Sequence, residues 1–160
     1  MTSGFSHENS RRMIIQPRPR TPEFIMQLIV NADDFGLTRG VNLGIIEAFQ
    51  QGIVRSTTLM VGMAAQNHAV ALARENPGLK VGIHLRLTAG KPMADKVTSL
   101  QTSDGTMQDL RQFMANSSMC PQEIEKELRT QIEHFLSLGL PLSHIDGTTI
   151  ATIIHWLRPS

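Results

Sequence analysis

The stretch QLIVNADDFGLTRGVNLGIIEAFQQGIVRSTTLMV, residues 27–61, decides the fold class of this 160-residue chain. Residues 27–32 are a short apolar run, which predicts a buried strand. In residues 41–50 the apolar side chains recur at helical spacing, and Gly52 follows as a helix stop. Residues 53–61 are rich in β-branched side chains and predict a second strand. Strand, helix and strand in this order predict two parallel strands joined by a crossover helix.

The same alternation continues toward the C-terminal end of the chain. Residues 64–75 have a helical pattern, and residues 79–87, LKVGIHLRL, alternate as a strand does. Residues 88–117 show no clear period and predict mainly loop, whereas residues 121–138 are the clearest helix and residues 142–146 predict another strand. We therefore expect an α/β protein with about four βα units. An open sheet or a partial (β/α) barrel fits this count, because a whole barrel typically needs about 250 residues.

The composition excludes several classes of protein. Fifteen basic and fourteen acidic residues give a net charge of +1, so nothing in the charge favours a nucleic acid or an anionic membrane as partner. The single cysteine, Cys120, excludes an internal disulfide and a multi-cysteine metal cluster. Membrane spans need about 18 consecutive apolar residues, and the sequence has no such run.

The N-terminal segment, residues 1–25, differs from the rest by its prolines and arginines. Its longest apolar piece is three residues, 13–15, and a secretory signal needs about 7–15. We expect a disordered or non-native extension there, a domain over residues 26–147, and a cytoplasmic protein.

Residues that could carry chemistry occur at the carboxyl ends of three predicted strands, where parallel α/β folds place their sites. Asp33 and Asp34 follow the first strand, and one could bind a metal while the other acts as a general base, although Asp and Gly also favour simple turns. His84 shares a strand face with Gly82 and Arg86 and could be a ligand or a packing residue. His144 and Asp146 share a face by period two. Together these side chains suit zinc or another divalent ion.

Three strings in this order resemble a known family. LIVNADDFGLTRGVNLGIIEAFQQGIVRSTTLMV, VGIHLRLTAGKP and LSHIDG resemble the YdjC-like carbohydrate deacetylases, and among them the chitooligosaccharide deacetylases. The resemblance implies a distorted (β/α) barrel that hydrolyses N-acetyl groups of amino-sugar oligosaccharides. It implies Asp33 as general base and Asp34 and His84 as ligands of a magnesium or zinc ion. Arg86 is a candidate for contact with a substrate oxygen or with an acidic side chain, and a homodimer is expected from the family.

The sequence departs from the family pattern after Gly147. The family has a third ligand histidine in H-x-D-[SG]-H-H-H, and Thr148 stands at that position here. A one-base shift of suitable codons would restore a run of histidines followed by proline, so we expect residues 148–160 to be an out-of-frame tail. On this hypothesis the chain is truncated relative to the family's barrel. Two alternatives then remain open: an enzyme acting on another acylated sugar or amide, and an inactive fragment or pseudogene product.

Overall fold

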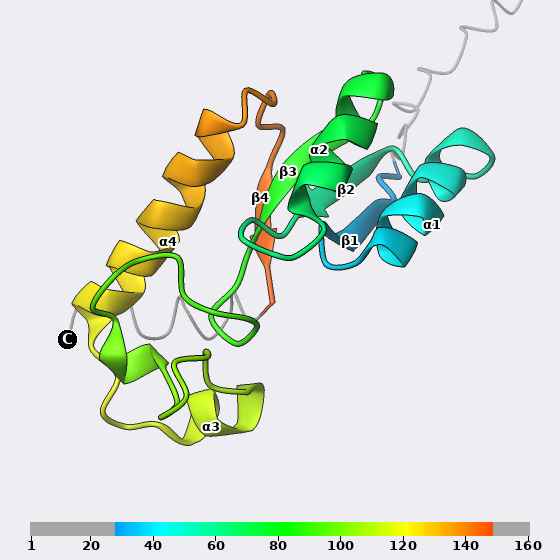
Figure 1. Cartoon of the computed structure of the whole chain (residues 1–160). Coiled ribbons are helices and arrows are strands. Elements are labelled where there is room, and N and C mark those ends of the chain that lie inside the picture. Colours follow the sequence, from blue (N-terminus) through cyan, green and yellow to red (C-terminus); the bar gives the residue numbers. More distant parts are fainter. Residues whose placement is uncertain (1–27, 149–160) are drawn as a thin grey trace, which may run out of the picture.

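A four-stranded parallel sheet forms the centre of the structure, a computed structural model that describes residues 28–148 (Figure 1). The strands lie side by side in chain order: β1 (Asn31–Phe35), β2 (Ser56–Leu59), β3 (Lys80–Leu85) and β4 (Ile145–Gly147). Parallel strands alternating with helices confirm the α/β prediction. Within the described residues there are three βα units and a fourth strand.

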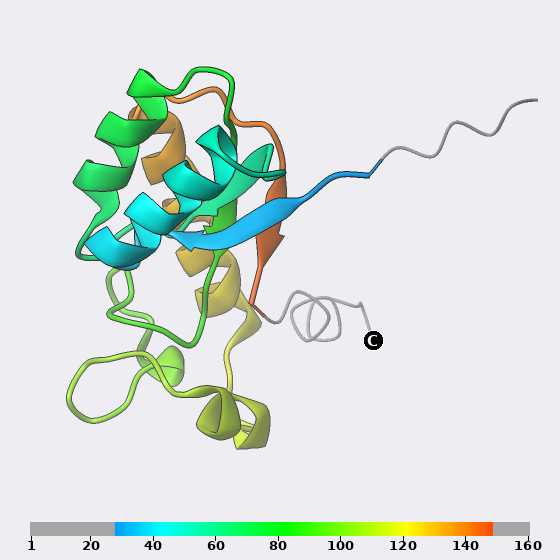
Figure 2. The same cartoon turned by 90° about the vertical axis from the view of Figure 1, so that its right-hand side faces the viewer.

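The helices form one layer against this sheet. Figure 2 shows the three longer helices on the same side of the strands. The helical elements are α1 (Arg39–Gln50), α2 (Gln66–Glu75), a 3₁₀ turn η1 (Thr98–Leu100), α3 (Leu110–Ala115) and α4 (Pro121–Ser137). No helix in the described part of the chain is long and apolar enough to cross a membrane.

Local sequence signals explain where the main helices begin. The Thr38 hydroxyl caps α1 by accepting the Val41 N–H at 3.2 Å. Pro121 opens α4, where its fixed φ suits the first turn and its missing N–H costs nothing. Ile124 and Phe135 of α4 are fully buried, so the apolar stripe predicted for this helix packs into the core.

The core lies between the sheet and the helical layer. Val81, Ile83 and Leu85 alternate along β3, are buried, and belong to the same apolar cluster as the inner faces of the helices. Gly82 and His84 therefore point to the other face of the sheet. This division leaves the face opposite the helices free for polar side chains.

The structure corrects several details of the prediction, among them the fourth strand, which is Ile145–Gly147 rather than residues 142–146. The first strand runs from Asn31 to Phe35 rather than over residues 27–32, because pairing with β2 begins at Asn31, and Leu28 and Ile29 are 85% and 78% exposed. The second strand is shorter than residues 53–61. The predicted loop 88–117 contains η1 and α3, which are too short to show a helical period.

The predictions for residues 1–25 and for the tail after Thr148 concern segments outside the described residues. The proposed domain boundaries therefore stay predictions.

Candidate metal centre

The first strand brings two adjacent carboxylates to the site through a break in its regular geometry. In a regular strand Asp33 and Asp34 would point to opposite faces. The pairing of β1 with β2 shifts register between Ala32 and Phe35, and Asp34 has a left-handed φ of 66°. A bulge of this kind redirects side chains. Asp34 Oδ1 consequently lies 3.7 Å from His84 Nε2, on the side of the sheet where Asp33 also lies.

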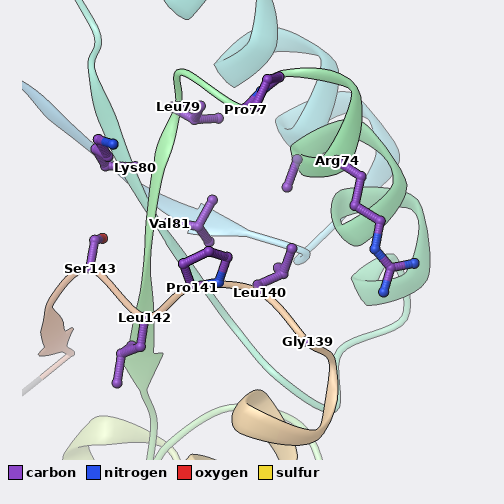
Figure 3. A pocket seen from close by; sticks show the side chains of 11 residues that line it. Arg74, Pro77, Leu79, Lys80, Val81, Gly139, Leu140, Pro141, Leu142 and Ser143 are labelled. Atoms are coloured by element: carbon purple, nitrogen blue, oxygen red, sulfur yellow. The ribbon is translucent and has the colours of Figure 1, made fainter.

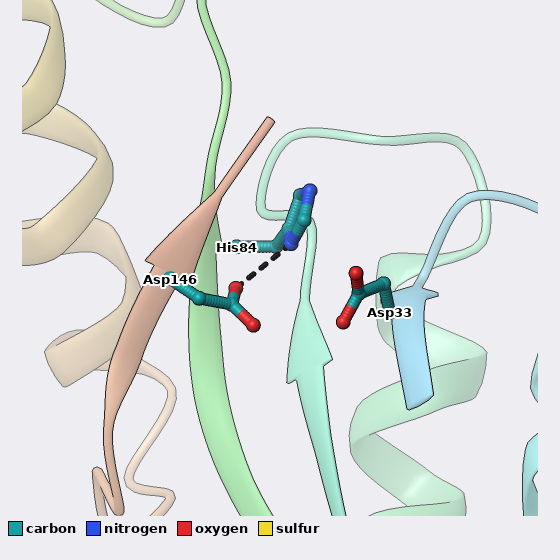
Figure 4. Close-up of side chains that lie close together, drawn as sticks. All are labelled: Asp33, His84 and Asp146. Carbon is teal, nitrogen blue, oxygen red and sulfur yellow. Dashed lines mark hydrogen bonds and ion pairs between the residues drawn. The ribbon is translucent and has the colours of Figure 1, made fainter. Parts of the chain in front are cut away.

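His84 is the buried centre of the group, with 4% of its surface exposed. Its Nδ1–H donates to Asp146 Oδ1 at 2.8 Å (Figure 4). Its Nε2 then carries the lone pair, which accepts the Thr148 hydroxyl at 2.8 Å and faces Asp34. A carboxylate behind the far nitrogen of an imidazole is the usual support of a metal-binding histidine.

Asp33, His84 and Asp146 converge from β1, β3 and β4 (Figure 4). One possible ligand atom from each lies within 4.8 Å of the others. Two carboxylates and an imidazole are a donor set that zinc, manganese and magnesium accept, so the residues present fit a divalent cation. Asp33 and Asp34 were predicted to lie just after a strand and instead lie within it, whereas His84 and Asp146 occupy the strand positions expected.

Two polar residues of this face were not singled out in the sequence. The Thr58 hydroxyl lies 3.1 Å from Asp146 Oδ2, 3.3 Å from His84 Nδ1 and 3.5 Å from Asp33 Oδ1. The Asn31 amide donates to Asp33 at 2.8 Å. Side chains two residues apart in a strand lie on the same face, so the position of Asn31, two residues before Asp33, could have placed it on the face of the site. Nothing in a lone Thr or Asn, however, distinguishes it from an ordinary strand residue.

Arg86, the candidate for substrate contact, lies apart from this group. Its side chain is buried, and its guanidinium donates to the main-chain oxygens of Val61 and Lys91 at 3.1 Å and to that of Ala89. Burial lowers the pKa of Arg86, and the nearby Glu127 carboxylate raises it in part. Through these hydrogen bonds Arg86 stabilises the loop that follows β3.

A cavity of about 410 Å³ lies at the opposite, amino-terminal ends of β3 and β4 (Figure 3). Its wall is mostly apolar, with Arg74 and Lys80 as its charged residues, and it includes no carboxylate or imidazole. The residues that could carry hydrolytic chemistry therefore lie at the carboxyl ends of the strands and not in this cavity.

Comparison with known proteins shows the family to which the chain belongs. The sequence profile described as "YdjC-like protein" matches residues 27–155, and the chain belongs to this family. It is 51% identical over 122 residues to a carbohydrate deacetylase of Vibrio cholerae serotype O1, covering 76% of this chain and 48% of that protein. Carbohydrate deacetylases of Brevibacillus brevis and Vibrio vulnificus are 52% and 54% identical over the same length, with the same coverage.

A solved structure shares the fold. The crystal structure of a protein of Enterococcus faecalis, provisionally named a cellobiose-phosphate cleavage protein, superposes with a TM-score of 0.73 at 33% identity. The match covers 80% of this chain and 52% of that one. The chain thus spans about half the length of the relatives it matches.

Proposed function

We propose that this chain carries the metal-binding part of a carbohydrate deacetylase site and acts in removing N-acetyl groups from amino-sugar oligosaccharides of the chitooligosaccharide type. The observation that carries the proposal is the convergence of Asp33, Asp34, His84 and Asp146 at one end of the sheet. Its relatives are named carbohydrate deacetylases, which supports the substrate class.

In the proposed site Asp34 and His84 are the ligands of a magnesium or zinc ion. Such an ion, when bound, supplies Lewis acidity toward the acetamide oxygen. Asp146 fixes the His84 tautomer through Nδ1, so that Nε2 keeps its lone pair for the ion. The 3.7 Å between Asp34 Oδ1 and His84 Nε2 supports this pairing, because two ligand atoms about 2.1 Å from a tetrahedral zinc lie roughly 3.4 Å apart.

Asp33 is proposed as the general base. Its side chain is exposed, so water and a sugar acetamide can reach it. The carboxylate takes a proton from the attacking water while the new C–O bond forms. When the C–N bond breaks, a proton returns to the amine, and the products are acetate and the free amino sugar.

One observation favours a second candidate, a chain that lacks the family's third metal ligand and does not turn the substrate over. The Thr148 hydroxyl donates to His84 Nε2 at 2.8 Å, the lone pair that the proposed ion requires. Thr148 also stands where the family pattern has a histidine. A neutral hydroxyl is a much weaker ligand than an imidazole.

The test is acetate release from N-acetylated chitooligosaccharides by the chain and its Thr148→His variant, with zinc or magnesium. Restoring an imidazole should raise acetate release at least about tenfold, and adding Asp33→Asn should lower it again by about 100-fold. If both chains bind the ion and neither releases acetate, the second candidate is correct. A homodimer, also proposed, is tested by light scattering of the same samples.

A further inference from the structure

Side chains of the two outer strands touch across the face of the sheet that bears the candidate site. Two strands lie between β1 and β4, so in a flat sheet the outer strands would be about 14 Å apart. Nevertheless Asn31 of β1 lies 3.2 Å from Asp146 of β4 and 3.1 Å from His144, measured between their polar atoms. Side chains of this size span that gap only because the sheet is curved, with this face inside the curve.

The Asn31 amide makes a different contact at each of its ends. Its Nδ2 donates to Asp33 Oδ1 at 2.8 Å and to Asp146 Oδ2 at 3.2 Å, and its Oδ1 faces His144 Nε2 at 3.1 Å. Two carboxylates require a donor, so the amide must have this orientation. His144 therefore donates from Nε2, and its Nδ1 accepts the Ser143 hydroxyl at 2.8 Å. Every polar atom of this bridge has a defined role.

Gly82 makes room for the histidine of the bridge. A Cβ on Gly82 would lie 2.5 Å from the His144 carbonyl oxygen and 2.8 Å from its Cε1 and Nδ1. That same carbonyl accepts the Ile83 N–H at 3.1 Å, so β4 cannot move away without losing a main-chain hydrogen bond. The His144 imidazole is thus held in place against Gly82 of β3.

We propose that Asn31, held by His144 over Gly82, is a positioning residue of the candidate metal centre. Its amide holds Asp33, the proposed base, and Asp146, the support of His84, at a fixed separation. The two carboxylates repel one another, and an N–H shared between them offsets that repulsion while no cation is near. No hydrogen bond from the described residues reaches Asp33 Oδ2, which leaves that oxygen free to act.

The inference rests on the proposed metal chemistry, and its test reads metal binding directly. Zinc binding by the full 160-residue chain is measured by calorimetry, and cobalt(II) absorption reports the geometry of the site. Asn31→Leu should weaken zinc binding by about 10- to 100-fold and change the cobalt spectrum, since such losses follow removal of a group that orients a ligand. His144→Leu should have the same effect through the bridge.

Two matched variants separate this role from a general effect on folding. His144→Gln keeps a donor near the position of Nε2 and should restore binding to within about threefold of the wild-type value. Ser56→Ala is the second variant, and Ser56 is the β2 residue that pairs with Asn31. The Ser56 hydroxyl has no hydrogen-bond partner in the described residues, so this change should leave zinc binding unchanged. Circular dichroism checks that each variant is folded.

The outcomes distinguish the two proposals. If the wild-type chain binds zinc and folded Asn31→Leu binds it equally well with the same cobalt spectrum, the positioning role is wrong and the metal chemistry stands. If His144→Gln binds as weakly as His144→Leu, the bridge does not act through its hydrogen bond and the inference is overturned. A wild-type chain that binds no divalent ion overturns the proposed metal chemistry together with the role of Asn31.

Discussion

At the scale of single residues, Asp34 has a strained backbone conformation and is also a proposed metal ligand. Its φ of 66° lies in the left-handed region, where a residue other than glycine costs about 1 kcal/mol or more. Strain of this kind persists when the neighbouring structure imposes it, and it concentrates at functional sites. The bulge that causes it is also what turns Asp34 toward His84.

Asp34→Gly should therefore change stability and metal binding in opposite directions. Relief of the left-handed strain should raise the free energy of unfolding by about 0.5–1 kcal/mol. Loss of the carboxylate should weaken zinc binding by at least about tenfold. Urea unfolding and calorimetry on the same preparation measure the two effects.

Lys96 offers a matched control, because it has a φ of 56° and is exposed in the loop after β3. Lys96→Gly should give a similar gain in stability with no change in zinc affinity. Equal zinc affinities for Asp34→Gly and the wild-type chain would show that Asp34 is not a ligand.

The buried charges of Arg86 and Glu127 carry a second prediction at this scale. Glu127 is fully buried, and its carboxylate accepts the main-chain N–H groups of Met93 and Ala94 at 3.0 and 2.7 Å. Removing one buried charge leaves its partners unsatisfied, so Arg86→Leu and Glu127→Gln should each cost about 2–4 kcal/mol. The double variant should cost less than their sum, which a double-mutant cycle by urea unfolding measures. Strict additivity would mean that the two groups act independently.

At the scale of elements, two glycines show how differently the turns and strands constrain the chain. Gly139, after α4, has a φ of +70° and open space where a side chain would stand, whereas Gly82 in β3 faces the backbone of His144, just before β4. Gly139→Ala should cost about 1 kcal/mol from its backbone conformation alone. Gly82→Ala should cost about 2–3 kcal/mol, because β4 must shift. Thermal unfolding of both variants tests the order, and a smaller loss for Gly82→Ala would contradict it.

The elements also show what the sequence could predict. Hydrophobic period identified α1, α2, β3 and α4, since each buries one face against the core. It could not identify α3, whose six residues begin at a capping box between Asp109 and Gln112 rather than at an apolar stripe. The same pattern grouped Arg86 with His84 on one strand face, whereas β3 ends at Leu85 and the Arg86 side chain donates to main-chain oxygens of the neighbouring loops.

For the site, residue type and position at strand ends were sufficient to select His84 and Asp146. Asp33 and Asp34 were selected as well, but alternation alone would have separated them, and only the bulge in β1 explains how both reach one side. The partners that hold the group depend on the curvature of the sheet, which no local pattern encodes.

At the scale of the whole molecule, a bound ion should stabilise the fold by mass action. Asp34, His84 and Asp146 come from three strands, so they can act together only in the folded chain. Zinc at about 100 times its Kd should raise the free energy of unfolding by about 2.7 kcal/mol, and a chelator should reverse the gain. Asp34→Asn should abolish most of it. An unfolding midpoint that does not respond to zinc would contradict binding at this site.

The one-sided helical layer has a consequence for how such a protein can change over generations. The apolar core lies beneath the helices, while the candidate chemistry lies on the other face of the same strands. In β3, residues that pack in the core therefore alternate with residues that face the candidate site. Mutations on the polar face can thus explore new ligands and substrates while the apolar core beneath the helices preserves the architecture.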